Sequence, residues 1–269
     1  MKNVFGSASA AWLILFSMQA PAQPSARELL DKARGYVAAA PAIRRIDTSE
    51  QSAVFIVGES RMEQQPQTNV VTVEIDMSKH LARQTTTIQD QPFVMLKQGE
   101  KAAMKLGSGP WEIPRGPYEN LAKDMGNLFV CETETPETKE SGIVWKLAGT
   151  VLLDGQEAYV IETDKNSGVA LAQARMTKGM AKYFSGSPAG QPAIKVLEYS
   201  SKHWISKSDY RRLQAVQISK TLVMLPLPGG KEQQVEQSIK ATSRYSYGKV
   251  AIEIPEEARK VLAIKQNAK

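Results

Sequence analysis

The sequence predicts an α+β fold in which helices cover the concave face of a long, curved antiparallel sheet. Apolar and polar residues alternate with a period of two through most of the chain, which is typical of half-buried strands, and short turns separate these stretches. Only three or four segments repeat with helical spacing. A sheet of this length must curl, and a curled sheet with helices over its concave face encloses an apolar space.

The N-terminus has the layout of a secretory signal peptide. Lys2 precedes an apolar run centred on residues 11–16, and residues 20–22 (Ala-Pro-Ala) have the small side chains of a cleavage site. We therefore expect cleavage near Ala22, export to the periplasm, and one domain over residues 23–269. No cysteine lies near this cleavage site for acylation, so we expect no lipid anchor there.

The composition of the chain is that of a folded domain, with 42% hydrophobic and 23% charged residues. The formal net charge of +6 is spread along the chain, so nucleic acid is not an expected partner, whereas contact with an anionic membrane surface stays open. Cys131 is the single cysteine and cannot form an internal disulfide. Because it follows the apolar residues 128–130, we expect it to be a buried small hydrophobe, with intermolecular pairing as the alternative.

The first half of the chain predicts one helix and a β-meander. Ser25 and Glu28 have the spacing of a capping box, so a helix begins after Ser25 and ends before Pro41. From about residue 51 the hydrophobic period is two, and further strands are expected at residues 81–89, 93–97 and 101–106, with a tight turn at 98–100. The clearest alternation consists of Val71, Val73, Ile75 and Met77.

The second half alternates helices with longer strands. Pro117 is suited to the first position of a second helix. The dipeptide Asp154-Gly155 between two apolar stretches predicts a hairpin turn, because both residues tolerate positive φ. Helical spacing predicts a third helix over residues 169–184, although Gly179 weakens the pattern. The remaining segments are expected to be strands at 194–199, 203–205, 213–225, 234–247 and 250–254, followed by a helix that begins at Pro255.

Several short motifs occur along the chain in a characteristic order. After the first helix and the Val-Thr-Val-x-Ile strand come Gly-x-Gly-Pro-Trp at 107–111, the hairpin at 149–161, Trp-Ile at 204–205 and Tyr-Gly-x-Val-x-Ile-x-Ile-Pro at 247–255. This order resembles the periplasmic lipoprotein-carrier superfamily, which includes LolA-like and LppX- and LprG-like proteins. The resemblance implies a half-open β-barrel with helices as a lid and a cavity for the acyl chains of lipids or lipoproteins. Other members of this group are envelope sensors.

Catalytic and metal-binding motifs are scarce in this sequence. His80 and His203 are the two histidines, and neither has a partner at metal-ligand spacing, so we expect both to be exposed on strands. Glu74 and Asp76 share a strand face, but the regular alternation around them predicts solvated side chains rather than paired catalytic acids. We therefore expect no enzyme, metal or cofactor, and a hydrolase is the least favoured alternative.

An apolar ligand is the binding partner that these patterns favour. Flexible methionines suit a cavity that accepts acyl chains of variable shape, although the same residues could fill a solid core. The predicted lipid-binding residues are Val71, Val73, Ile75, Met77, Met95, Trp111, Met176, Met180 and Phe184, the last three on the lid helix. We expect a monomeric carrier that contacts a membrane or an envelope protein during transfer. The alternative is a sensor or scaffold of the same fold that acts through protein–protein contacts.

Overall fold

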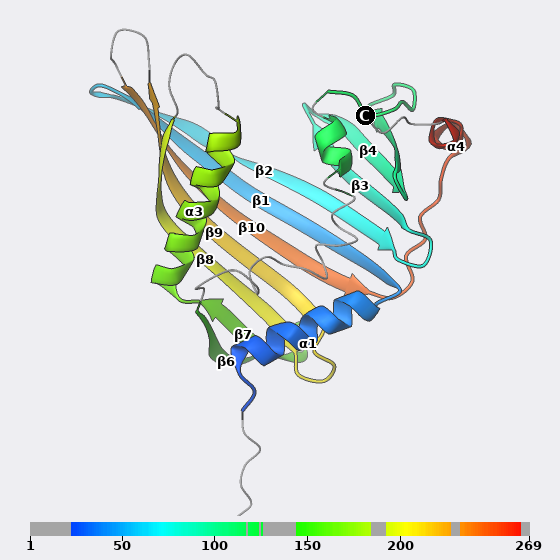
Figure 1. Ribbon diagram of the computed structural model, residues 1–269, viewed down its shortest axis with the longest axis horizontal. Coiled ribbons are helices and arrows are strands. Elements are labelled where there is room, and N and C mark those ends of the chain that lie inside the picture. The colour runs from blue at the N-terminus through cyan, green and yellow to red at the C-terminus, as the bar shows by residue number, and fades with distance from the viewer. Residues whose placement is uncertain are drawn as a thin grey trace, which may run out of the picture.

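Ten antiparallel strands form one open, curved sheet in the computed structural model (Figure 1). The structure describes residues 23–116, 118–123, 125, 144–183, 192–226 and 232–264. The expected signal peptide and Cys131 lie outside the described residues.

The strands follow each other around the sheet, except at one central junction. Their order is β5-β4-β3-β2-β1-β10-β9-β8-β7-β6, so the first and last strands are neighbours and β5 and β6 lie at the two edges. The predicted antiparallel α+β fold is therefore confirmed. The strands are β1 (Ala42–Val57), β2 (Ser60–Asp76), β3 (Leu81–Ile88), β4 (Gln91–Gln98), β5 (Lys101–Leu106), β6 (Trp145–Leu153), β7 (Gln156–Thr163), β8 (Ala193–Ser206), β9 (Arg212–Pro226) and β10 (Glu232–Tyr247).

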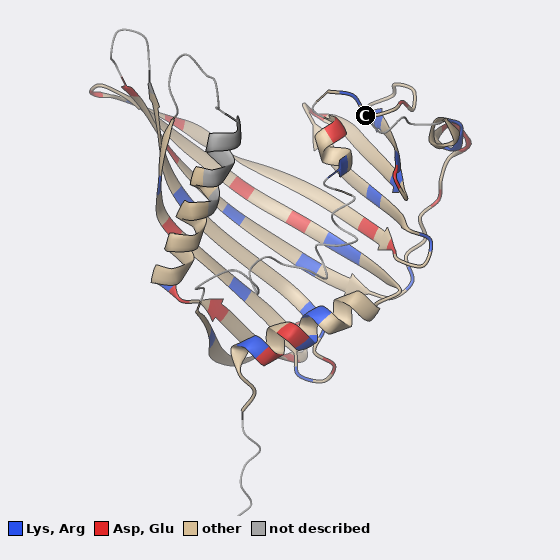
Figure 2. Cartoon of the chain, viewed as in Figure 1, with Lys and Arg blue, Asp and Glu red and all other residues tan. Residues whose placement is uncertain are grey.

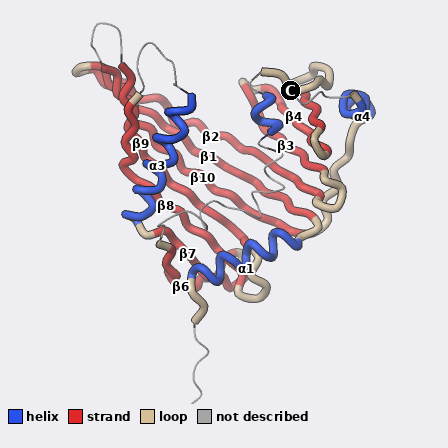
Figure 3. Tube along the Cα trace, in the orientation of Figure 1, coloured by secondary structure: helices blue, strands red, loops and turns tan. Residues whose placement is uncertain are grey.

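Helices lie on both faces of the sheet. The two longest, α1 (Ala26–Ala39) and α3 (Lys165–Tyr183), share one face, where α1 packs on Ile161 and Ile205 and α3 packs on β8 (Figure 3). A short helical segment at residues 118–123 lies on this same face, above β4. Helix α4 (Glu256–Ala263) packs on the opposite face, so it is an exception to the expected one-sided cover. We call the first surface the helix-bearing face.

The predicted capping and turn signals have the expected local structures. The Ser25 hydroxyl accepts from the Glu28 backbone N–H, and Glu28 accepts from the Ser25 backbone N–H, which completes the capping box of α1. Asp154 and Gly155 both have positive φ, at 48° and 78°, as a tight hairpin turn requires. These two predictions are confirmed because each depends on residues that are close in sequence.

Two strand predictions were wrong in detail. The segments expected at 194–199 and 203–205 form one strand, β8, which contains a bulge between Val196 and Glu198. Residues 250–254 alternate between apolar and polar side chains but are not a strand in the structure. Instead, Ile252 is buried against Leu81 and Leu96, so the alternation reflects packing on the sheet surface rather than pairing at its edge.

The two faces of the sheet differ in the charges they carry. On the opposite face, cross-strand ion pairs connect neighbouring strands, including Lys240 with Glu50 at 3.7 Å and Lys202 with Glu162 at 3.1 Å. Figure 2 shows how charged positions are distributed along the central strands. Alternation places these charges away from α1 and α3, so the helix-bearing face is left to apolar and uncharged polar side chains with few exceptions.

No helix in the described ranges has the length and apolar character that crossing a membrane would require.

Candidate functional site

A methionine-rich apolar cluster covers the helix-bearing face at strands β2 to β5. Its sequence origin is the two-residue period of these strands, which places alternate apolar side chains on one side. We call it the methionine-rich cluster. Its buried members are Val73, Ile75, Ala82, Phe93, Met95, Ala102, Met104, Ala122 and Met125, and Val71, Met77, Ile88, Leu106, Tyr118 and Leu121 pack against them partly buried.

The cover of this cluster is a short helical segment rather than one of the long helices. Tyr118 stacks on Phe93 with ring centroids 5.6 Å apart and an interplanar angle of 21°. Ala122 and Met125 are buried in the same contact, whereas Leu121 is only partly buried. A cover of about two turns buries little surface by itself, so moving it aside requires breaking few contacts.

The structure brings together five of the nine predicted lipid-binding residues. Val73, Ile75 and Met95 are buried in the methionine-rich cluster, and Val71 and Met77 pack at its border. Met77 also contacts the end of α1 through the cluster around Val37 and Ile43. The face predicted from the alternation in β2 is therefore the helix-bearing face.

The other four predicted residues do not join that cluster in the described structure. Met176 lies on α3 and packs with Val196 and Tyr199, over a different part of the sheet. The side chain of Met180 and all of Phe184 lie outside the described residues. Trp111 packs against Leu81 and Leu96 on the opposite face, because β3 and β4 present these two side chains away from the cluster.

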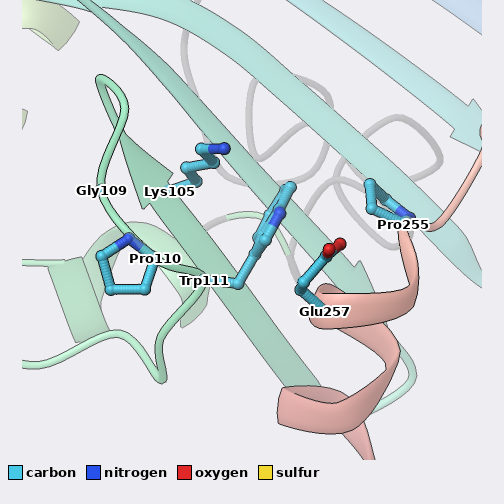
Figure 4. Close-up of a pocket in the computed structure, with 6 residues that line it drawn as sticks. All are labelled: Lys105, Gly109, Pro110, Trp111, Pro255 and Glu257. Atoms are coloured by element: carbon cyan, nitrogen blue, oxygen red, sulfur yellow. The ribbon is translucent and has the colours of Figure 1, made fainter.

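The surroundings of Trp111 form a separate, open pocket of about 410 Å³. Figure 4 shows the indole between the Lys105 side chain and the first turn of α4, where Pro255 and Glu257 lie. The pocket thus lies between β5 and α4, on the other side of the sheet from the methionine-rich cluster. It offers one cation and one carboxylate and does not extend the apolar surface of that cluster.

A polar region separates the methionine-rich cluster from the apolar contacts of α1 and α3. Arg45 donates to Asp47 at 2.9 Å in the middle of β1. Across the sheet, Asp47 pairs with Ser243 on β10, Ser243 pairs with Ala215 on β9, and Ala215 pairs with His203 on β8. The apolar surface of the helix-bearing face is therefore divided, and only its β2 to β5 part is rich in methionine.

His203 is buried, so the expectation of an exposed strand histidine was wrong. It is 6% exposed, its Nε2 lies 3.1 Å from the Ser201 hydroxyl, and its ring meets Trp145 edge-on at 5.1 Å. Burial, together with the charge of Arg212, lowers the pKa of His203 to about 3. A neutral imidazole at neutral pH acts here as a packed core group. His80 is exposed, but it lies in a turn rather than on a strand.

The two acids of β2 are held by partners on the opposite face, so the expectation that they are solvated was also wrong. Arg83 donates to Glu74 at 2.7 Å, and Arg44 lies 3.9 Å from the same carboxylate. The Ser78 hydroxyl donates to Asp76 at 2.6 Å and holds the pKa of this carboxyl below its ordinary value. Among the described residues, no three metal-ligating side chains come together.

Sequence reasoning missed Phe93, Met104 and Met125 as cluster members, and it missed Lys97. Phe93, Met95 and Lys97 alternate along β4 and are all buried. The sequence contained a sign that Lys97 faces the cluster, because this lysine continues the two-residue alternation of Phe93 and Met95. It was overlooked because a charge at the end of a strand is usually solvated.

Comparison with known proteins adds a likeness of fold. Neither a protein-family model nor a curated protein matches the sequence. The lipoprotein LppX of Mycobacterium tuberculosis is similar in structure with 12% identity over 79% of this chain and 92% of that chain, at a TM-score of 0.36. A DUF1329 family protein from Desulfovibrio piger is similar with 12% identity over 88% and 97%, at a TM-score of 0.27. At these values the likeness concerns the path of the chain alone.

Proposed function

We propose that this protein is a carrier that binds an acyl chain of a lipid or lipoprotein in the methionine-rich cluster. The observation that carries the proposal is an apolar cluster with four methionines, three of them buried, beneath a cover of about two helical turns. Methionine is unbranched and polarisable, so such a cluster repacks around chains of different shape at low cost. The chain would enter by displacing the segment that contains Tyr118 and Leu121.

Burial of an acyl chain provides a substantial driving force for binding. Each methylene that leaves water contributes about 0.8 kcal/mol, so even half of a long chain offsets the loss of the contacts made by a short helix. We therefore propose that the protein retains lipid when it is isolated from the periplasm, which is the compartment that its N-terminus predicts.

The test is native mass spectrometry with solvent extraction on the chain from Gln23, exported to a bacterial periplasm. We expect an additional mass that extracts as lipid. Val71→Glu places a carboxylate at the border of the cluster and should remove this mass, because a charge next to the chain is strongly unfavourable. Val70→Glu is the matched control, since Val70 is 48% exposed and points to the opposite face, so this variant should retain the lipid.

Two results would contradict the carrier proposal. One is equal lipid retention by the Val71→Glu and Val70→Glu variants, which would place the ligand elsewhere. The other is a clean apo mass together with failure to take up a fluorescent fatty acid, which would favour the sensor or scaffold alternative. Met176→Glu, on α3, tests whether the bound chain extends beyond the methionine-rich cluster to the cluster around Tyr199.

A further inference from the structure

Lys97 is a lysine with a largely buried side chain at the border of the methionine-rich cluster. It lies near the end of β4 and is 6% exposed. Phe93 and Met95 precede it at two-residue intervals and belong to the cluster, so alternation places Lys97 on the same helix-bearing face.

The immediate neighbours of Lys97 are small and apolar. Its register partners are Ala82 on β3 and Ala102 on β5, and Ile75 on β2 lies opposite Ala82 in the same row. Both alanines are buried members of the methionine-rich cluster. A lysine between two alanines is therefore the single charged position in this row from β2 to β5.

In the described part of the chain, Lys97 has no ion-pair or hydrogen-bond partner. Neighbouring cations on the opposite face differ in this respect, because Arg83 is paired with Glu74 and Lys79 with Asp76. An ammonium group beside apolar side chains gains a charge-assisted hydrogen bond when an anion lies next to it. An anionic group brought by a ligand would supply the partner that Lys97 lacks in the described residues.

We propose that the occupant of the methionine-rich cluster is a free fatty acid whose carboxylate pairs with Lys97. This inference rests on the proposed function and specifies the chemistry of its ligand. The chain runs from Lys97 along β4 past Met95 to Phe93, a distance of about 13 Å at the rise of a β-strand. A carboxylate beside Lys97 forms an ion pair with its ammonium, which a neutral ester cannot form.

The experiment compares the binding of palmitic acid and methyl palmitate to the delipidated chain from Gln23 at pH 7.5. The two ligands share their chain and differ in head-group charge. For the unaltered protein we expect palmitic acid to bind about tenfold more tightly, the value for one hydrogen bond to a charged group. Lys97→Met keeps the length of the side chain and removes its charge, so both ligands should bind this variant with similar affinity. Lys97→Arg should restore the preference for the acid.

Lys101→Met is the matched control, because Lys101 is on the adjacent strand and points to the opposite face. It should leave both affinities unchanged. Circular dichroism verifies that each variant is folded, and Lys97→Gln replaces Lys97→Met should that variant fail to fold.

The outcomes separate this inference from the proposed function. Equal binding of acid and ester by the unaltered protein, or a preference for the acid that survives Lys97→Met, overturns the role of Lys97 and leaves the carrier function standing. Binding of neither ligand by any variant overturns the carrier function and the inference with it.

Discussion

At the scale of single residues, burial decides what each ionisable group can do. His203 and Lys97 are each 6% exposed, but they differ in their partners. His203 lies beside a hydroxyl and an indole and stays neutral, which suits a group that completes the core. Lys97 places its charge beside apolar side chains, where the carboxylate of the proposed ligand would pair with it. Residue type alone does not distinguish these two roles.

The lowered pKa of His203 predicts an acid-sensitive fold. The unfolded chain takes up a proton near pH 6.5, whereas the folded chain takes it up only near pH 3. Between these values the free energy of unfolding should therefore fall as the pH falls, by up to about 1.4 kcal/mol per pH unit, and above pH 6.5 this contribution is constant.

Chemical denaturation between pH 4 and pH 8 measures this slope. In the His203→Gln variant, the slope of the free energy of unfolding against pH should be smaller below pH 6.5, by the contribution of about one bound proton. His80→Gln is the comparison variant, because it removes the exposed histidine and keeps the buried one. An unchanged slope in His203→Gln would show that other groups cause the acid sensitivity.

At the scale of elements, one side chain attaches α3 to the sheet. Gln173 accepts from the Val196 backbone N–H at 2.7 Å and donates to the Ile194 carbonyl at 2.7 Å. These backbone groups lie next to the bulge in β8, where the ladder of strand hydrogen bonds is interrupted. The helix also packs tightly on the strand at Gly168, where an added Cβ would lie 3.0 Å from the Tyr199 ring.

Removal of the Gln173 amide should loosen α3 without unfolding the sheet. Gln173→Ala leaves the Val196 N–H without its partner, so we expect a loss of about 1 to 3 kcal/mol in the docking of the helix. Hydrogen exchange should increase in α3 and near Val196 and stay unchanged in α1. Ala174→Ser changes an exposed position of α3 next to Gln173 and serves as the control. Equal effects of the two variants would show that apolar packing alone holds α3.

At the scale of the whole molecule, the sheet depends on the pairing of its first and last strands. The strands β1 to β5 form one meander and β6 to β9 form another, and β10 connects them by pairing with β1 on one side and β9 on the other. The methionine-rich cluster belongs to the first meander and the α3 contact to the second. The methionine-rich cluster and the α3 contact therefore share one cooperative framework through β10.

A proline in β10 should consequently disrupt both halves of the molecule. Thr242 faces Thr48 on β1 and Val216 on β9, so Thr242→Pro removes a donor from the centre of the sheet. We expect loss of cooperative thermal unfolding. Ala148→Pro is the matched control at an edge, because Ala148 has no register partner in the bulge of β6, and it should cost much less. Survival of either meander in Thr242→Pro, seen as protected amides in hydrogen exchange, would contradict this view.

The features that could be predicted from the sequence are those set by neighbouring residues. The capping box of α1, the turn at Asp154 and Gly155, and the alternation from Val71 to Met77 all have the expected local structure. The grouping of five predicted ligand-binding residues on one face also follows from this alternation. Trp111 could not be placed in this way, because its position depends on how the segment after β5 returns across the sheet.

By itself, the sequence determined the fold class, the helix start, the hairpins and the face of each strand, since these follow from dihedral preferences and hydrophobic periods over a few residues. Only the tertiary structure decided that β10 pairs with β1, that α4 packs on the opposite face, and that Lys97 and His203 are buried. The physical reason is that pairing and burial depend on which distant segments meet when the chain collapses. Local chemistry sets which face a side chain is on, whereas the rest of the chain sets what covers it.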